Sequence, residues 1–467
     1  MAGVAICGCL GLACGKTTVP ADHGFGRSVL IQGVPHVQQK PDFCGEADVE
    51  MVLRFLGKDV NQDQVFAVSG MDPARGKGVT TTELATALEQ LGFKPGEVWY
   101  QVAPSTAERD LTKIWRALVG DLEARIPSII CMNTGTGPNS TEHFRLVLGY
   151  DADRDEVIYH EPAETQGAYR RMPRARLFKL WPLKYAERQW TVVRLRLEPG
   201  KLVDPPPIRG FSPSELVQHV MALRKDLPAG FTVVVEPPFV IVGNGAPDEI
   251  RRMAKETVGW AVRRLHQDFF ARDPQRILDI WLLKDNESYQ ETSLAITGGE
   301  ADTPYGFYAP REGVLIMNIA TGGGTLVHEL VHPFMEANCP RCPAWFNEGL
   351  GSLYEACSER RGHIVGLRNW RLAELRYAIR RHELPSFREL TRLTGRAFYQ
   401  GQHSRNYAQA RYLLYALQEG GLLLPYYRAM TARLGSDPTG YAALVQVIGV
   451  EDMAQFQRRW EAEMLKL

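Results

Sequence analysis

The most informative segment of the sequence reads Gly324-Thr325-Leu326-Val327-His328-Glu329-Leu330-Val331-His332. We interpret it as a helix on which His328 and His332 lie one turn apart on the same face, so that both imidazoles can bind one metal ion. Glu329 can point its carboxylate at a water molecule on that ion, as hydrolytic zinc centres require. The alternative is an amphipathic helix that carries two surface histidines.

A catalytic zinc ion needs a third protein ligand, and a second predicted helix supplies a candidate. Glu348 would project from this helix toward the two histidines, with a solvated carboxylate as the alternative. Glu355 lies about two turns further on the same side and could orient a ligand. The predicted Zn²⁺ ligands are therefore His328, His332 and Glu348, with Glu329 as the general base.

The pattern His328-Glu329-x-x-His332 followed by Asn347-Glu348-Gly349 resembles the gluzincins, the metallopeptidase group that includes thermolysin and aminopeptidase N. It resembles the peptidase MA-like domains more closely still. The resemblance is strongest over residues 314–356. It implies a mostly helical, thermolysin-like fold with a small edge sheet, and zinc-dependent hydrolysis of peptides.

The segments around the predicted helix with His328 and His332 support further predictions. Pro333 directly follows His332, removes a helix hydrogen bond and disfavours helical geometry, so we expect the helix to kink or end there. A strand predicted over residues 314–318 precedes the helix, and the resemblance implies that a strand beside the site pairs with extended peptide substrate. Residues 248–270 are expected to form one long amphipathic helix.

The resemblance also implies a tyrosine or histidine that donates a hydrogen bond to the developing oxyanion. Tyr407 is our candidate for this role, and Tyr399 and His403 compete with it. The alternative for Tyr407 is a core position on a helix, where tyrosine is common.

A second informative segment surrounds Cys44, in Gln38-Gln39-Lys40-Pro41-Asp42-Phe43-Cys44-Gly45-Glu46-Ala47. Apolar positions after Cys44 follow helical spacing, which places this thiol at a helix N-terminus. There the helix dipole and a nearby imidazolium would lower the thiol pKa and favour the nucleophilic thiolate. His143 opens a predicted strand and is the expected base. Glu161 follows the next strand and could orient the His143 ring.

These residues resemble the papain-like peptidases that cut double-glycine leader peptides, and their stand-alone relatives. The resemblance implies a papain-like fold in which Cys44 is the nucleophile and His143 the base. It also implies that Gln39 donates to the oxyanion, or Gln38 if the register differs by one. The alternative is that Cys44 is a small buried residue and His143 is structural.

The chain departs from that family pattern at two positions. Glu161 stands where the family has aspartate, and its extra methylene shifts the geometry around the imidazole. Glu46 stands where a proline is usual. Both departures favour a rival hypothesis, a papain-like domain that binds peptides without turnover. The joint retention of Cys44 and His143 argues against it.

Bulk properties limit the remaining choices. The 467 residues predict two or three domains, and 54 basic residues balance 54 acidic ones, so nothing points to a nucleic-acid partner. We expect a signal-like or disordered N-terminus over residues 1–27, a papain-like domain over 28–198, a Pro-rich linker over 199–212 and a gluzincin-like domain over 213–467.

The cysteines carry two further predictions. Cys7, Cys9 and Cys14 lie in segments that resemble imperfect bacterial lipoprotein boxes, which would imply export and a lipidated anchor in the cell envelope. The alternative is a frayed terminus without a targeting role. Between the two metal-ligand helices, Cys339-Pro340-Arg341-Cys342 could be a short disulfide, a redox pair or half of a structural metal site. Because no second cysteine pair is in view, a plain loop or a disulfide is favoured over a second zinc site.

The sequence therefore predicts an α+β, two-domain peptidase that acts on peptide or protein substrates. A zinc site lies in its C-terminal half and a Cys-His site in its N-terminal half. The rival hypothesis is a peptide-binding or scaffold protein in which the cysteine site, or both sites, no longer turn over.

Overall fold

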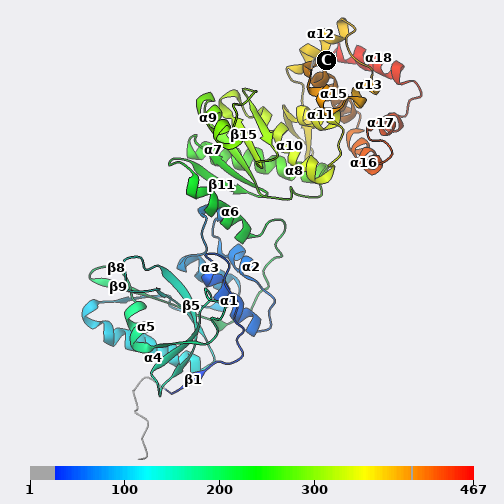
Figure 1. Cartoon of the computed structure of the whole chain (residues 1–467). Helices are drawn as coiled ribbons and strands as arrows, with labels where there is room; N and C mark the ends of the chain where they lie inside the picture. The colour runs from blue at the N-terminus through cyan, green and yellow to red at the C-terminus, as the bar shows by residue number, and fades with distance from the viewer. Residues whose placement is uncertain (1–26, 401–402) are drawn as a thin grey trace, which may run out of the picture. The chain divides into compact units, whose positions relative to one another are not determined.

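The computed structural model of the chain describes residues 27–400 and 403–467, so the lipid-anchor prediction at Cys7, Cys9 and Cys14 lies outside the described residues. The chain forms two compact units. The first contains the chain up to Met71 together with Gly78–Pro207. The second contains Asp72–Lys77 together with Ile208–Leu467. Figure 1 colours the elements of both units in chain order.

The boundary between the units falls inside the predicted linker over residues 199–212. Strand β10 (Glu198–Pro199) pairs with β2 (Phe93–Lys94), and the backbone N–H of Val203 donates to the Leu91 carbonyl at 3.1 Å. The first part of this Pro-rich stretch is therefore held to the first unit by backbone hydrogen bonds.

Segment Asp72–Lys77 belongs to the second unit, which the sequence did not indicate. Its 3₁₀ turn η1 (Pro73–Arg75) packs against helix α6 (Pro213–Asp226), where Ala74 joins an apolar cluster. Arg224 donates to the Ala74 carbonyl at 2.9 Å. This docking depends on the shape of the second unit, so no local pattern marks it.

The first unit is built on an antiparallel sheet of order β3-β9-β4-β5-β6-β7, with β1 paired to β5 and β8 paired to β9. The central strand β4 contains a buried apolar run over residues 129–132, and β5 contains another over residues 146–148. The strands are β1 (Val29–Leu30), β3 (Trp99–Val102), β4 (Ser128–Asn133), β5 (Glu142–Asp151), β6 (Glu156–His160), β7 (Arg170–Pro173), β8 (Leu183–Ala186) and β9 (Gln189–Arg196).

Helices pack against this sheet and position Cys44. Helix α1 contacts β5, and Gly45 permits that approach, because a Cβ there would lie 2.8 Å from the Leu84 side chain and 3.1 Å from that of Phe144. The helices are α1 (Cys44–Phe55), α2 (Gln62–Ser69), α3 (Thr81–Gln90), α4 (Ala107–Glu123) and α5 (Arg174–Leu180), with a 3₁₀ turn η2 (Pro104–Thr106).

The second unit begins with a mixed sheet of order β11-β12-β13-β15-β14. Strands β12, β13 and β15 are parallel to one another, while β11 and β14 are antiparallel edge strands. The strands are β11 (Thr232–Glu236), β12 (Phe239–Gly243), β13 (Leu278–Leu283), β14 (Gly306–Ala309) and β15 (Val314–Asn318), followed later by the hairpin β16 (Cys357–Arg360) and β17 (His363–Gly366).

The rest of the second unit is helical and shares one large apolar core with the sheet. Phe334 of helix α10 (Gly324–Asn338) stacks on Phe270 with ring centroids 5.7 Å apart, which anchors that helix to the core. The helices are α7 (Pro247–Met253), α8 (Trp260–Asp268), α9 (Asn286–Thr297), α10 (Gly324–Asn338), α11 (Ala344–Tyr354), α12 (Arg371–Arg380), α13 (Phe387–Arg392), α14 (Gly395–Tyr399), α15 (His403–Glu419), α16 (Leu423–Arg433), α17 (Tyr441–Ile448) and α18 (Met453–Met464), with a 3₁₀ turn η4 (Ile319–Thr321).

Three local expectations are corrected. Of the two outcomes expected at Pro333, the end of the helix is wrong: α10 continues to Asn338, because buried packing on both sides of the proline offsets one lost hydrogen bond. The helix expected over 248–270 contains a π-helical segment, η3 (Ala254–Gly259), between α7 and α8. The strand over 314–318 is internal, and the edge strand is β14, which the sequence did not reveal.

Within the described residues, no helix is both long and apolar enough to span a lipid bilayer.

Candidate metal centre and candidate thiol site

Helices α10 and α11 pack together and bring the predicted zinc ligands to one place. His328 and His332 come from α10, and Glu348 comes from α11. Gly351 lets α11 lie close to the imidazole, since a Cβ at that position would sit 3.0 Å from the His328 ring. The small residue one turn after Glu348 thus serves the geometry of the site.

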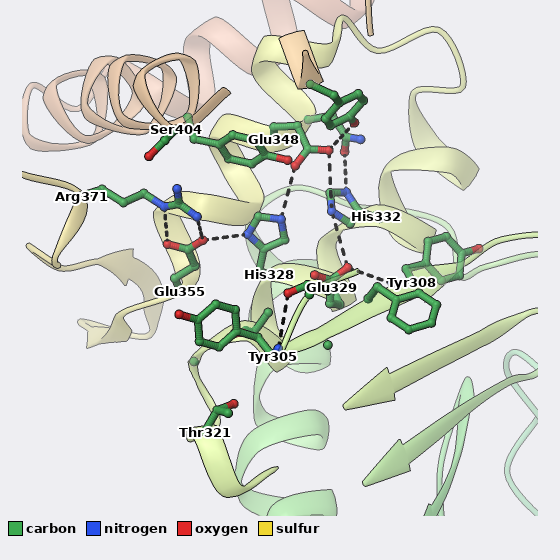
Figure 2. Close-up of a pocket in the computed structure, with 18 of the residues that line it drawn as sticks. Tyr305, Tyr308, Thr321, His328, Glu329, His332, Glu348, Glu355, Arg371 and Ser404 are labelled. Atoms are coloured by element: carbon green, nitrogen blue, oxygen red, sulfur yellow. Dashed lines mark hydrogen bonds and ion pairs between the residues drawn. The ribbon is translucent and has the colours of Figure 1, made fainter. Parts of the chain in front are cut away.

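The distances among these three side chains suit a shared ion. His328 Nε2 lies 3.4 Å from Glu348 Oε2, and His332 Nε2 lies 3.9 Å from Glu348 Oε1. Figure 2 shows both rings turned toward this carboxylate. Two ligand atoms on a tetrahedral zinc ion, each about 2.0 to 2.1 Å from the metal, are roughly 3.3 Å apart. The donor set therefore fits zinc with only small adjustments.

The opposite nitrogen of each imidazole faces an oxygen that can accept its hydrogen. His328 Nδ1 lies 3.2 Å from Glu355 Oε1, and His332 Nδ1 lies 3.1 Å from Asn347 Oδ1. This arrangement favours hydrogen on Nδ1 and directs both Nε2 atoms toward Glu348. Both rings are thus oriented as metal ligands require.

Glu355 is itself fixed by a second layer of contacts. Arg371 donates to its two oxygens at 2.8 and 2.6 Å, and Asn369 donates to Oε2 at 3.0 Å. Burial alone would raise the pKa of Glu355, but Arg371 and His328 lower it to about 2. Glu355 is therefore ionised and held in place, as a residue that orients a histidine ligand should be.

Glu329 lies beside the same centre but is held differently. One ligand atom from each of His328, Glu329 and His332 falls within a 4.8 Å cluster, so Glu329 is a geometric competitor for the metal. Its Oε2 accepts the Tyr308 backbone N–H at 3.1 Å, which draws it toward the edge strand β14. Glu348 Oε2 lies closer to an imidazole, at 3.4 Å, so Glu348 stays the candidate ligand and Glu329 the candidate base.

The pKa shifts follow from burial and mutual charge. Burial raises the pKa of Glu329 and outweighs its histidine neighbours. For Glu348, burial acts in the same direction, but His332 and His328 pull its pKa below the usual range. Burial would lower the pKa of His328, yet Glu348 and Glu355 raise it to about 10. The Glu348 and Glu355 carboxylates therefore stay ionised and favour the protonated form of the His328 imidazole.

A cavity of about 900 Å³ opens onto these residues. Arg371 is the one Lys or Arg side chain lining it in the described part of the chain, and Glu355 already pairs with that guanidinium. The carboxylates Glu329 and Glu348 face the two histidines without a further cationic partner. A divalent cation would balance this charge, so the residues present fit Zn²⁺.

Two tyrosines compete for the oxyanion role beside the cavity. Tyr399 Oη already donates to Glu348 Oε1 at 2.6 Å, so its hydrogen orients a predicted ligand. The half-buried Tyr407 ring stacks 6.4 Å from the His328 ring and carries the Arg371 guanidinium over its face at 4.9 Å. Burial, followed by the charge of Glu348 and a hydrogen bond to it, raises the pKa of Tyr407, so the hydroxyl keeps its hydrogen. The side chain of His403 is outside the described residues.

Strand β14 presents a backbone edge to the cavity. The Tyr305 carbonyl accepts the Asn318 N–H, and the Ala309 carbonyl accepts the Gly313 N–H. The backbone polar groups of these odd-numbered residues therefore face β15. The even-numbered Tyr308 points the other way, toward Glu329. Gly306 and Tyr308 both line the cavity.

The thiol predicted as a nucleophile has a different environment. Cys44 begins α1 as predicted, but the expected lowering of its pKa is wrong. Burial raises the pKa of the Cys44 thiol, a backbone hydrogen bond from Phe144 opposes this, and the Glu46 and Asp48 carboxylates raise it further. The helix N-terminus does not overcome the loss of water and two acids on the same helix.

The predicted His-Glu pair does come together. His143 Nε2 lies 2.5 Å from Glu161 Oε1, and Arg145 donates to Glu161 Oε2 at 2.6 Å. Burial would raise the pKa of Glu161, but the hydrogen bond to His143 and the charge of Arg145 lower it. Within the described residues, no hydrogen bond joins Cys44 to His143, so the structure orients the predicted base through Glu161 alone.

The two glutamines near Cys44 differ in exposure. Gln38 is exposed, and its Oε1 accepts from Thr165 at 3.2 Å. Gln39 is half-buried with Oε1 shielded from water and without a partner, so it is the better placed of the two for an interior role. Glu46, at the family's proline position, is fully buried and accepts the Val79 N–H at 2.9 Å.

Sequence reasoning missed several residues that support these sites. Asn347 stands next to Glu348 in the quoted motif, so its role was within reach. Arg371, Arg145 and Asp48 carried no recognisable pattern, because each acts through contacts between distant segments.

Comparisons with known proteins bear on the first unit. Residues 31–188 match the Peptidase_C39 like family. Among solved structures, the peptidase domain of Streptococcus ComA, a bi-functional ABC transporter involved in a quorum-sensing pathway, is 18% identical to this chain. That alignment covers 36% of this chain and 99% of the other, with a TM-score of 0.25. No curated protein matches the chain.

The family match supports a papain-like, C39-type domain at the N-terminus, in agreement with the resemblance drawn from Cys44 and His143. A domain of that kind acts on peptide or protein substrates. The match ends at residue 188, so the second unit is interpreted from its own residues.

Proposed function

We propose that the second unit is a zinc-dependent peptide hydrolase. The observation that carries this proposal is the arrangement of two imidazoles whose Nε2 atoms face one buried carboxylate, while Glu355 and Asn347 hold the opposite nitrogens. When bound, zinc would polarise a substrate carbonyl and acidify water. His328, His332 and Glu348 would hold it.

Glu329 would take the proton of the attacking water and pass it to the leaving amine. Its raised pKa suits this exchange, since a carboxylate with an ordinary pKa is a weak base near neutral pH. Tyr407 would donate its hydroxyl hydrogen to the oxyanion. The edge of β14 would align an extended peptide by backbone hydrogen bonds, with Gly306 and Tyr308 as the outward-facing residues.

The proposal is tested by metal analysis together with a peptidase assay on a quenched fluorescent peptide library. Glu329→Gln should keep zinc and lose about 100- to 10,000-fold in rate, the usual contribution of a general base. Glu291→Gln changes an exposed glutamate on α9 outside the cavity and should keep both properties. Full activity in Glu329→Gln would refute the assigned base, and a wild-type chain that binds no zinc would refute the whole proposal.

For the first unit we propose Cys-His peptidase activity of the C39 type, with a peptide-binding role without turnover as the second candidate. The paired His143 and Glu161 favour the first. The raised pKa of Cys44 favours the second. The reactivity of the Cys44 thiol decides between them.

A further inference from the structure

The connection between the two ligand helices is a tight turn bounded by cysteines. Cys339 follows the last residue of α10, and Cys342 precedes Pro343, the N-cap of α11. The Cys342 N–H donates to the Cys339 carbonyl at 2.8 Å, the bond that closes a β-turn. Such a turn keeps its end Cα atoms within about 7 Å, close to the 4.4 to 6.8 Å range of disulfides.

Both thiols are free, and the Cys342 S–H donates to the Pro343 carbonyl at 3.6 Å. Cys342 lowers the pKa of the Cys339 thiol, whereas burial raises the pKa of Cys342 well above its usual range. Because the thiolate is the form that attacks disulfides, the exchange depends on the short separation that the turn enforces and not on an acidic thiol at Cys342. Cys339 is buried, whereas Cys342 is half-buried, so a small reagent can reach the pair from one side.

We propose that Cys339 and Cys342 form a thiol–disulfide exchange site whose co-reactant is a small disulfide, R–S–S–R. One thiolate attacks R–S–S–R, forms a mixed disulfide and releases one R–S⁻. The second thiolate then attacks the protein sulfur of that mixed disulfide and releases the other R–S⁻. Two cysteine thiols are oxidised to one disulfide, R–S–S–R is reduced to two thiols, and the two protons pass to the released thiolates.

A disulfide between Cys339 and Cys342 would affect the predicted zinc site, because the two cysteines lie in the turn between the ligand helices. The turn is the direct connection between His332 on one helix and Asn347 and Glu348 on the other. A covalent link across it limits how far the ends of α10 and α11 can separate. The oxidised chain should therefore hold the three predicted zinc ligands together for longer. This effect rests on the proposed zinc site, whereas the exchange chemistry does not.

The exchange site is tested on the full chain with oxidised glutathione, alkylation of the remaining thiols and peptide mapping. The wild-type chain should lose two alkylatable thiols and yield a peptide in which Cys339 is joined to Cys342. Cys339→Ser should instead retain a glutathione adduct on Cys342, because the second thiol is absent. Cys357→Ser removes a half-buried cysteine of the same unit and should behave as wild type.

The effect on the metal site is measured as zinc release to a chromogenic chelator. Oxidised wild-type chain should release zinc about fivefold more slowly than reduced chain, and Cys339→Ser should show no dependence on glutathione. Full alkylation of both cysteines after oxidation, or an equally fast adduct on Cys357, overturns the exchange site. Equal release rates overturn its link to the metal. A chain without zinc contradicts the proposed hydrolase, while the thiol count still decides the exchange site.

Discussion

At the cavity of the second unit, buried carboxylates face imidazoles and a guanidinium, whereas around Cys44 in the first unit buried acids stand near one another. Glu348 and Glu355 keep their charge because His328, His332 and Arg371 compensate it. By contrast, burial raises the pKa of Glu46 to about 8 and that of Asp48 well above normal, and both Asp48 oxygens lack a partner. Burial therefore prepares one site for a cation and keeps the other neutral.

The largest expected effect tests whether Glu348 is a metal ligand. Glu348→Ala removes the carboxylate that both Nε2 atoms face, so zinc affinity should fall by more than about 100-fold, the upper end for residues that only orient a ligand. Competition with a fluorescent zinc chelator measures it, with Glu291→Ala as control. An unchanged zinc affinity in Glu348→Ala would mean that the metal binds elsewhere. The cavity and the Cys44 site would then no longer differ in being prepared for a cation.

A smaller loss is expected when the layer behind the ligands is weakened. Glu355→Gln removes the charge beside His328 Nδ1 but keeps the shape of the side chain. Zinc affinity should fall by about 10- to 100-fold in the same competition assay. A value equal to wild type would mean that the contact between Glu355 and His328 does not orient the ring.

The pH dependence of stability sharpens the comparison from the side of the first unit. Burial raises the pKa of Glu46 to about 8 in the folded chain. The protonated Glu46 therefore contributes to the free energy of unfolding in full below the pKa that it has in the unfolded chain, and this contribution is lost as pH rises toward 8. His160, whose pKa is lowered to about 4, makes the folded chain more stable as pH rises, but only below its ordinary pKa of about 6.5.

Between pH 6.5 and 8 the first unit should therefore lose about 1 to 2 kcal/mol from Glu46 alone. Hydrogen exchange of the α1 amides in the full chain measures this loss. Glu46→Gln should flatten the profile, because its amide oxygen can still accept the Val79 N–H. A wild-type profile that rises with pH in this window would show that Glu46 is ionised in the folded chain.

The smallest expected effect concerns the thiol itself. At pH 7.5, iodoacetamide should label Cys44 about tenfold more slowly in the folded chain than in the urea-unfolded chain, because burial and two acids raise its pKa. Glu46→Gln should change the rate little at this pH, because its raised pKa already keeps Glu46 mostly protonated. Labelling of Cys44 faster than in the unfolded chain would instead favour an activated nucleophile and cysteine peptidase turnover.

Much of the local structure was readable from the residues. The apolar run at Val314–Asn318 forms the predicted strand, and Cys44 begins a helix as its following apolar spacing indicates. Pairing of His143 with Glu161 followed from two adjacent strands, whose ends must lie near each other in an antiparallel sheet. The edge strand β14 escaped because four residues with Gly306 and two aromatics lack a clear alternation.

The sequence by itself determined which side chains could serve each chemistry, since helical spacing places His328 beside His332 and strand order places His143 near Glu161. Tertiary structure alone decided their charge states. Desolvation and compensation depend on the distances between Arg371, Glu355 and His328, or between Asp48 and Glu161, and these come from separate segments. A pKa is set by everything within a few ångströms, and no linear pattern records that neighbourhood.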